Sequence, residues 1–210
     1  MFVFSTTENI LFQKLTKMAA VTFFGSSHAC RHHWFPQHFL PLFEYSTRLV
    51  IQPEDIVGQS GRKMDERAVR DIIQCARKKS PQKHFIVVNL GTNNLRRRDW
   101  EKSDFPEDLI GFYKEIAQAL ESFPNCQLVI PSLIPSFGQD DILKDEYRRF
   151  SDHAKALASL KKNVRFYNFS RRLCVNGKLD PSCFSDDVHL SKKGAKIYAE
   201  SIFNYLENHC

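Results

Sequence analysis

Short apolar runs alternate along the chain with segments that repeat apolar residues at helical spacing. The clearest run is His84–Leu90 (HFIVVNL), which is rich in β-branched residues and ends at Gly91. Further strands are expected at residues 21–24, at 48–52 and 55–57 on either side of Pro53, at 127–133 and at 164–169, and amphipathic helices at 64–79, 105–123, 141–160 and 192–206. Buried strands that alternate with such helices form parallel sheets covered on both faces, with right-handed crossovers. The sequence therefore predicts a three-layer α/β/α sandwich around a mostly parallel, five-stranded sheet.

The 210 residues are enough for one domain with a substantial core, and the 18 phenylalanines predict an aromatic interior. The first 17 residues carry Glu8, Lys14 and Lys17, which argues against a signal peptide. We expect residues 1–17 to be an appendage and residues 18–210 to form the domain. No segment approaches the run of about 18 apolar residues that a membrane span requires. Six scattered cysteines without a CxxC pair predict reduced thiols, mostly buried, in a cytoplasmic protein.

Polar residues gather where the expected strands end. Gly25–His28 (GSSH) follows the first strand, Gly58–Gly61 follows the second, and Gly91–Asn94 (GTNN) follows the third. A fourth segment, FSDDVHLSKKG, places Asp186 three residues before His189 and ahead of the last helix. In open parallel sheets, ligands bind beyond the carboxyl ends of the strands. The four segments should therefore meet in one site.

These segments contain the parts that acyl transfer requires. A serine nucleophile must lose its proton to a base, and a neutral histidine can accept that proton if a carboxylate holds its other nitrogen. We assign Ser27 as the nucleophile, His189 as the base and Asp186 as the residue that orients the base. The oxyanion that forms needs hydrogen-bond donors. The backbone N–H groups of Ser27 and Gly61 and the side-chain amide of Asn93 can supply them.

The same four segments resemble the SGNH/GDSL hydrolase family, which is named after a serine, a glycine, an asparagine and a histidine in four sequence blocks. The blocks match Gly25–Ser27, Ser60–Gly61, Gly91–Asn94 and Asp186–His189, in family order within residues 21–199. The resemblance implies a flavodoxin-like fold and a serine esterase that works through an acyl-enzyme; we expect no cofactor and no metal. Ser26 and Asn94 replace two aspartates of the family pattern. We expect both to tune hydrogen bonds that hold the loops.

Three stretches, GSSHACRHHW, PSLIPSFGQDD and NGKLDPSCFSDDVHLSKKG, are also similar to the esterase domain in the first open reading frame of LINE retrotransposons. This narrower resemblance implies a retroelement-derived esterase. Its substrate would be a small-molecule or lipid ester with an acyl or acetyl group. The acyl length should depend on pocket walls formed by loops at residues 34–43 and 132–139.

Other interpretations of the same residues stay open. Ser26 and Ser27 are also typical of a turn that caps a helix, and His189 could be a structural histidine. His28 and His32 are spaced like two metal ligands on one helix face, but no third ligand is evident in the sequence. We therefore expect a partly exposed helix after the nucleophile and no metal site.

The net charge is +6, and short basic runs carry much of it, including Arg96, Arg97 and Arg98 directly after the third loop. These arginines should lie at the rim of the site, where they would pair with phosphate oxygens or simply form a solvated loop. A domain of the same fold without esterase chemistry could bind RNA or anionic lipid through such residues. The presence of all three candidate catalytic residues favours the esterase. The sequence does not indicate an oligomeric state.

Overall fold

The computed structural model describes residues 18–30, 33–79, 82–96, 105–135 and 141–210. At its centre is a parallel sheet with the strand order β2-β1-β4-β5-β6, and β3 also pairs with β1. The strands are β1 (Ala19–Gly25), β2 (Leu49–Val50), β3 (Ile56–Gly58), β4 (His84–Asn89), β5 (Cys126–Pro131) and β6 (Val164–Tyr167). Because β2 and β3 pair with successive parts of β1, around the 3₁₀ helix η2 (Pro53–Asp55), the six strands fill five positions. The five-stranded parallel sheet predicted from the sequence, with its break at Pro53, is confirmed.

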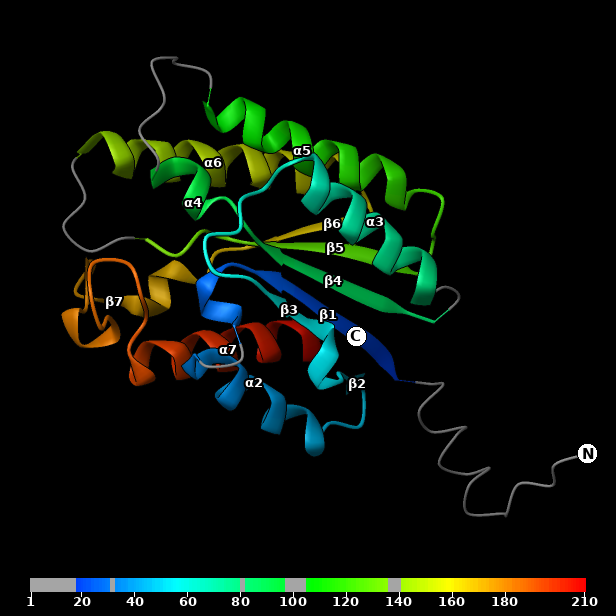
Figure 1. The fold of residues 1–210 in the computed structure, drawn as a ribbon, viewed down its shortest axis with the longest axis horizontal. Helices are drawn as coiled ribbons and strands as arrows, with labels where there is room; N and C mark the ends of the chain where they lie inside the picture. The colour runs from blue at the N-terminus through cyan, green and yellow to red at the C-terminus, as the bar shows by residue number, and fades with distance from the viewer. Residues whose placement is uncertain (1–17, 31–32, 80–81, 97–104, 136–140) are drawn as a thin grey trace, which may run out of the picture.

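Helices cover both faces of this sheet (Figure 1). One face carries α3 (Glu66–Lys79), α5 (Phe105–Leu120) and α6 (Asp141–Leu160), with the short α4 (Thr92–Arg96) near its end, and the other carries α2 (Trp34–Glu44) and α7 (Lys192–Glu207). Each face buries its own apolar cluster. The three-layer α/β/α sandwich is therefore confirmed. The expected appendage at residues 1–17 lies outside the described residues, so the domain limits stay a prediction.

Helix α2 corrects the expectation of a loop at residues 34–43. Two prolines, at positions 36 and 41, weaken the helical signal of this segment. Phe35, Phe39 and Phe43 nevertheless lie four residues apart and are buried against the sheet and α7. The ring of Phe35 lies 4.7 Å from that of Phe23 in β1 and 4.9 Å from that of Tyr198 in α7. Burial of these rings outweighs the low helix propensity, and it confirms an aromatic interior on this face.

A small antiparallel hairpin follows β6 and the 3₁₀ helix η3 (Ser170–Leu173). It consists of β7 (Cys174–Val175) and β8 (Lys178–Leu179). Asn176 and Gly177 have φ angles of 51° and 77°, as a type I′ turn requires. The hairpin leads into the 3₁₀ helix η4 (Pro181–Cys183), which precedes the loop that holds His189.

The register of the sheet brings the ends of three strands to the same level. Gly25 at the end of β1 pairs with Gly58 of β3 on one side and with Asn89 of β4 on the other. The 3₁₀ helix η1 (Ser27–Ala29) starts directly after β1 and lies against Gly58. Three of the four loops that the sequence singled out therefore begin at one edge of the sheet.

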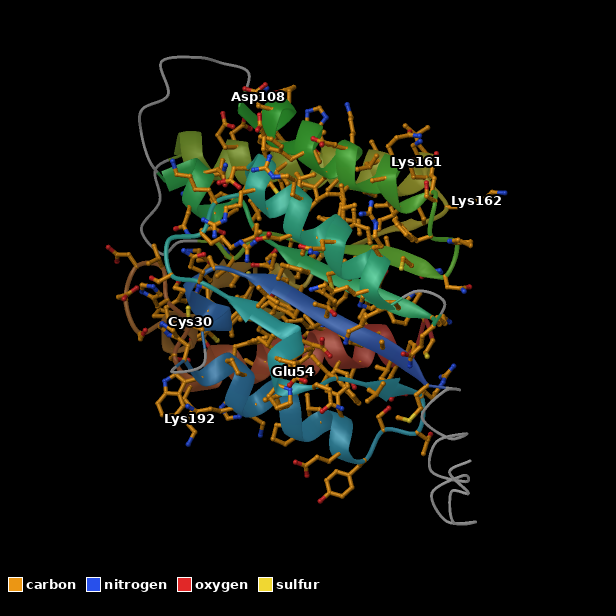
Figure 2. All side chains as sticks on the ribbon, turned by 45° about the vertical axis from the view of Figure 1, so that its right-hand side comes forward. Cys30, Glu54, Asp108, Lys161, Lys162 and Lys192 are labelled. Carbon is orange, nitrogen blue, oxygen red and sulfur yellow. The ribbon has the colours of Figure 1, made fainter. Side chains whose placement is uncertain are left out.

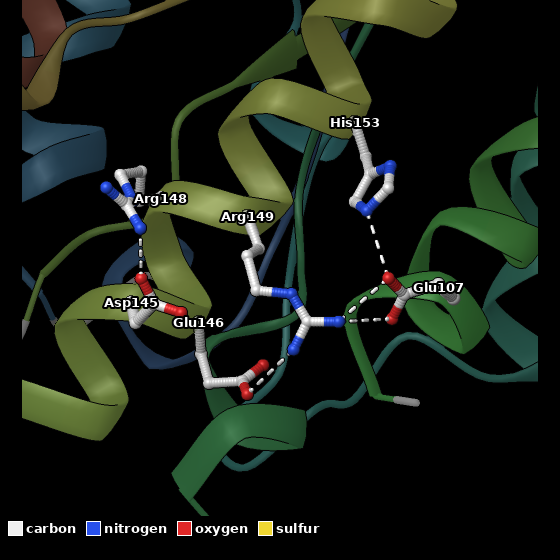
Figure 3. A network of polar contacts seen from close by, with 6 residues as sticks. All are labelled: Glu107, Asp145, Glu146, Arg148, Arg149 and His153. Atoms are coloured by element: carbon white, nitrogen blue, oxygen red, sulfur yellow. Dashed lines mark hydrogen bonds and ion pairs between the residues drawn. The ribbon is translucent and has the colours of Figure 1, made fainter. Parts of the chain in front are cut away.

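An ion-pair network on the outer surface joins α5 to α6 (Figure 3). Glu107 in the first turn of α5 accepts hydrogen bonds from Arg149 at 2.9 and 3.1 Å, and it lies 3.1 Å from Nε2 of His153. Arg149 also lies 3.4 Å from Glu146. Surface pairs of this kind each contribute little to stability, because solvent screens their charges. The network's role is to hold the two helices together.

Two further features bear on the environment of the protein. All six cysteines are free thiols in the structure, as predicted, with three of them buried and three half-buried. None of the described helices combines the length and the apolar character needed to cross a membrane. The cytoplasmic location stays a prediction.

His84, the first residue of β4, is fully buried and neutral. Its Nε2 lies 2.9 Å from Oγ1 of Thr22, and its Nδ1 lies 3.9 Å from Sγ of Cys126. Burial, followed by the positive charge of Lys79, lowers the pKa of His84 from 6.5 to about 4. In the folded protein the imidazole of His84 therefore stays unprotonated as the pH falls, until the pH approaches about 4.

We expect the protein to lose stability as the pH falls from about 6.5 towards 4. The unfolded chain binds a proton at His84 below about pH 6.5, whereas the folded chain does not until about pH 4, so unfolding takes up a proton in this window. The free energy of unfolding, measured in urea, should be lower at pH 5.0 than at pH 7.5 by about 2 kcal/mol from this histidine. H84Q should flatten the pH dependence, and an unchanged dependence in that variant would contradict the assignment.

Candidate active site

Asp186 and His189 face each other within a loop closed by a bridge between Phe184 and Leu190. Oδ2 of Asp186 lies 2.7 Å from Nδ1 of His189, and Oδ1 accepts the backbone N–H groups of Val188 and His189 at 2.8 and 2.7 Å. Partial burial opposes ionisation, but these hydrogen bonds outweigh it and lower the pKa of Asp186 to about 2. The ionised carboxylate can only accept a hydrogen bond, so Nδ1 of His189 carries the hydrogen. The Nε2 atom of neutral His189 is then the proton acceptor.

The turn after β1 exposes one of its two serines. Ser26 is buried, whereas Ser27, the first residue of η1, is partly accessible. The turn is held by backbone hydrogen bonds from Ala29 to Ser26 at 3.1 Å and from Cys30 to Ser27 at 3.0 Å. A substrate could therefore approach Ser27 more readily than Ser26.

His28 ties the turn that bears Ser27 to the loop that bears His189. Its Nε2–H donates to the carbonyl oxygen of Val188 at 3.1 Å, and its ring lies 5.5 Å from the ring of His189. Burial, reinforced by the nearby His189 and His33, lowers the pKa of His28 to about 3, so the side chain is neutral. A partly exposed helix does follow Ser27, as expected, but it begins only at Trp34 as α2, whereas His28 is buried in the short η1. Its role in the structure is to clamp two loops together.

The described residues do not form a metal centre. Within their ranges, no group of three or more histidine, cysteine, aspartate or glutamate side chains is placed to hold a metal ion. His32, one of the two histidines spaced like ligands, lies outside those ranges. His33 instead stacks on His189, with ring centres 5.7 Å apart and planes 17° from parallel.

Gly61 lies on the loop after β3 and Asn93 lies in the short helix α4, and these two segments are hydrogen-bonded to each other. Gly61 has a φ angle of 71°, and Nδ2 of Asn93 donates to the carbonyl oxygen of Arg62 at 3.1 Å. The next residue, Asn94, is buried and binds the backbone of Met64 twice, accepting its N–H and donating to its carbonyl oxygen, both at 2.8 Å. The prediction that Asn94 holds loops together is confirmed. These bonds fasten α4 to the segment between β3 and α3.

Replacing Asn94 by aspartate, the residue of the family pattern, should destabilise this protein. The carboxylate could still accept the N–H of Met64, but it would lose the donated bond and face the carbonyl oxygen in a buried place. We expect the free energy of unfolding in urea at pH 7.5 to fall by about 2 kcal/mol. N204D, at an exposed position of α7, is the matched control. Equal stability of the two variants would contradict this account.

The structure brings the candidate residues together in part. Asp186 and His189 are in direct contact, and His28 links their loop to the turn of Ser27. Within the part of the chain that the structure describes, the hydroxyl of Ser27 forms no hydrogen bond with His189. Such bonds often tighten only when substrate is bound.

The arginine run after the third loop falls largely outside the described structure. Arg96 is the last residue of α4, but its side chain, and Arg97 and Arg98 entirely, lie outside the described residues. The anion-binding role of these three arginines stays a prediction.

The segment that the sequence predicted as a pocket wall, residues 34–43, begins with a half-exposed aromatic residue. Trp34, the first residue of α2, is 43% exposed, and Nζ of Lys192 lies 5.4 Å over its ring. Trp34 directly follows His33, which stacks on His189. In the view of Figure 2, Lys192 lies on the left-hand side of the molecule, as Cys30 does, and Lys161 and Lys162 lie on the right-hand side. Trp34 therefore lies close to His189, although the sequence did not indicate its contact with Lys192.

A sequence profile of the GDSL-like lipase/acylhydrolase family matches residues 22–197, a span that contains all four sequence blocks. The chain belongs to this family. Membership of the GDSL-like family confirms the resemblance of the four sequence blocks to the SGNH/GDSL hydrolases.

Two other proteins are similar in sequence to part of this GDSL-like chain. The platelet-activating factor acetylhydrolase IB subunit beta homolog of Drosophila melanogaster is 23% identical over 123 residues, which cover 58% of this chain and 52% of that protein. Inter-alpha-trypsin inhibitor heavy chain H3 of Mesocricetus auratus is 26% identical over 190 residues, which cover 81% of this chain and 20% of that protein. The chain thus spans about half of one relative and a fifth of the other.

Solved structures share the fold of this GDSL-like chain. A carbohydrate esterase of family 3 from Talaromyces cellulolyticus has a TM-score of 0.67 and 18% identity, covering 91% of this chain and 97% of its own. A mutant of Axe2, an acetyl-xylooligosaccharide esterase from Geobacillus Stearmophilus, has a TM-score of 0.64 and 14% identity. The match covers 90% of this chain and 95% of the esterase. At these identities the similarity establishes the fold.

Proposed function

We propose that this chain is a serine esterase that hydrolyses carboxylic esters through an acyl-enzyme intermediate. The Oγ atom of Ser27 attacks the carbonyl carbon while Nε2 of His189 takes the hydroxyl proton, and the carboxylate of Asp186 stabilises the resulting imidazolium. The oxyanion accepts hydrogen bonds from the backbone N–H groups of Ser27 and Gly61 and from the side-chain amide of Asn93.

The second half of the reaction returns the enzyme to its starting state. His189 gives its proton to the alcohol oxygen as the bond to the carbonyl carbon breaks, and the acyl group stays on Ser27. A water molecule then attacks the carbonyl carbon of this acyl group, and Nε2 of His189 accepts a proton from the water. The proton passes to Oγ of Ser27 as the carboxylic acid leaves. One water is consumed, and one acid and one alcohol are released.

The contact between Asp186 and His189 carries this proposal. An ionised carboxylate on Nδ1 leaves Nε2 as the atom that accepts a proton, which is the tautomer that a general base needs. The clamp from His28 to Val188 holds this pair beside the turn that bears Ser27. A structural histidine would not require this arrangement next to an accessible serine at the end of a strand.

The substrates we propose are small-molecule or lipid esters with short acyl groups, acetyl first among them. The names of several similar proteins support this choice, because they include an acetylhydrolase and an acetyl-xylooligosaccharide esterase. The retroelement resemblance of the sequence stays a prediction. So does binding of RNA or anionic membranes through Arg96, Arg97 and Arg98, for which the described residues carry no observation.

Covalent labelling tests the assignment of the nucleophile. The full chain is incubated with a fluorophosphonate probe, and the modified peptide is mapped by mass spectrometry. We expect the adduct on Ser27, and we expect S27A to lose both labelling and hydrolysis of 4-nitrophenyl acetate. An adduct on Ser26 or Ser60, or no adduct on a preparation that hydrolyses the ester, would disprove the assignment.

A further inference from the structure

A hollow of about 290 Å³ opens beside Gly61, between the end of β3 and the first turn of α3. Its wall runs from the end of β3 to the first turn of α3 and includes Ser60, Lys63, Asp65 and Arg67. Gly61 supplies one of the proposed oxyanion donors. A single substrate could therefore place its ester carbonyl at Gly61 and another of its groups in the hollow.

Two of the cations in this wall are available to a ligand. Lys63 is half-buried and Arg67 is exposed, and neither forms an ion pair with another residue of the described ranges. Asp65 is the acidic residue among those that line the hollow, and its Oδ1 already accepts the N–H of Ala68 at 2.8 Å. The wall therefore presents more positive than negative charge.

Arg62 also lines the hollow, but its guanidinium is occupied. It lies 2.7 Å from Oδ2 of Asp71 and 5.6 Å from the ring of Phe24, and its side chain is only 10% exposed. Its carbonyl oxygen accepts the hydrogen bond from Asn93. The side chain of Arg62 is thus held in place by Asp71 and Phe24, whereas the side chains of Lys63 and Arg67 can turn towards a bound anion.

We propose that the ester substrate carries a negatively charged group, a carboxylate or a phosphate, and that this group binds in the hollow against Lys63 and Arg67. The inference rests on the proposed function, because the hollow matters to catalysis only if the ester carbonyl sits at Gly61. Ammonium and guanidinium groups both form charge-assisted hydrogen bonds with carboxylate and phosphate oxygens. A neutral ester makes no such bonds and should be a poorer substrate.

Matched pairs of esters test the preference and show which arm of the substrate carries the charge. The 4-nitrophenyl monoester of succinate, against its methyl ester, places the charge on the acyl arm. 4-Acetoxyphenyl phosphate, against its dimethyl ester, places it on the alcohol arm. For one of these pairs we expect kcat/KM to be about tenfold higher for the charged member at low ionic strength, and the advantage to shrink as salt screens the charges.

The variant K63Q/R67Q should lower the ratio of charged to neutral kcat/KM about tenfold. R70Q is the matched control, because Arg70 lies on the same helix, is exposed, pairs with Glu66 at 3.6 Å and lies outside the hollow. A charged-to-neutral ratio of kcat/KM near one for both ester pairs would overturn the role of the hollow but not the esterase activity. The same holds if K63Q/R67Q and R70Q give equal ratios. A chain that hydrolyses none of the esters and is not labelled at Ser27 would overturn both proposals.

Discussion

Replacing Asp186 by asparagine is expected to lower kcat/KM for 4-nitrophenyl acetate about 10³- to 10⁴-fold. The asparagine can still accept the N–H groups of Val188 and His189 through Oδ1, so the loop should keep its shape. Its Nδ2 atom, however, replaces the oxygen that lies 2.7 Å from Nδ1 of His189. Two N–H donors cannot bond to each other, so the hydrogen of the imidazole moves to Nε2. That nitrogen can then no longer accept the proton of Ser27.

The adjacent carboxylate provides the control for this change. Asp187 is exposed, and D187N makes the same chemical replacement one residue away. We expect D187N to keep activity within a fewfold of the parent. Thermal unfolding of both variants checks that the fold is intact. If D187N loses more activity than D186N in a folded protein, Asp187 is the orienting residue and the present assignment is wrong.

Replacing Gly58 by alanine is expected to destabilise the fold by about 3 kcal/mol or more. A Cβ atom at this position would lie 2.2 Å from the carbonyl carbon and oxygen of Ala29 and 2.5 Å from the nitrogen of Cys30. These are backbone atoms of the turn that follows Ser27, so no side-chain rotation relieves the clash. Either β3 or the nucleophile turn must shift. Urea unfolding measures the loss of stability, and ester hydrolysis by the folded fraction reports the shift of the turn.

A second glycine gives the matched control. Gly111 lies within α5, and a Cβ atom there would meet no atom within 4 Å. G111A should raise the free energy of unfolding by up to about 1 kcal/mol, because alanine has the higher helix propensity. If G58A proves as stable as G111A, the turn after β1 is more adaptable than its backbone contacts indicate.

The sequence alone determined the layers of this fold and the loops that face its site. Runs such as His84–Leu90 are apolar on both faces, and such runs alternate with amphipathic helices. This pattern is local, so it can be recognised in the sequence without knowledge of tertiary contacts. A parallel sheet then places the carboxyl end of every strand at one edge. Ser27, Gly61 and Asn93 could therefore be selected by position. The spacing of three residues between Asp186 and His189 likewise predicted their contact.

The tertiary structure alone decided how these loops are held and what surrounds them. His28 bonds to Val188, 160 residues away, and Asn94 bonds to Met64, 30 residues away. No periodicity or spacing encodes such pairs, because they depend on which loops the finished sheet brings side by side. Helix α2 forms against its own propensity because the sheet and α7 offer its phenylalanines a buried surface. The hollow beside Gly61 is lined by residues 59–68 alone, and its shape depends on how this segment turns from β3 into α3, where Arg62 pairs with Asp71.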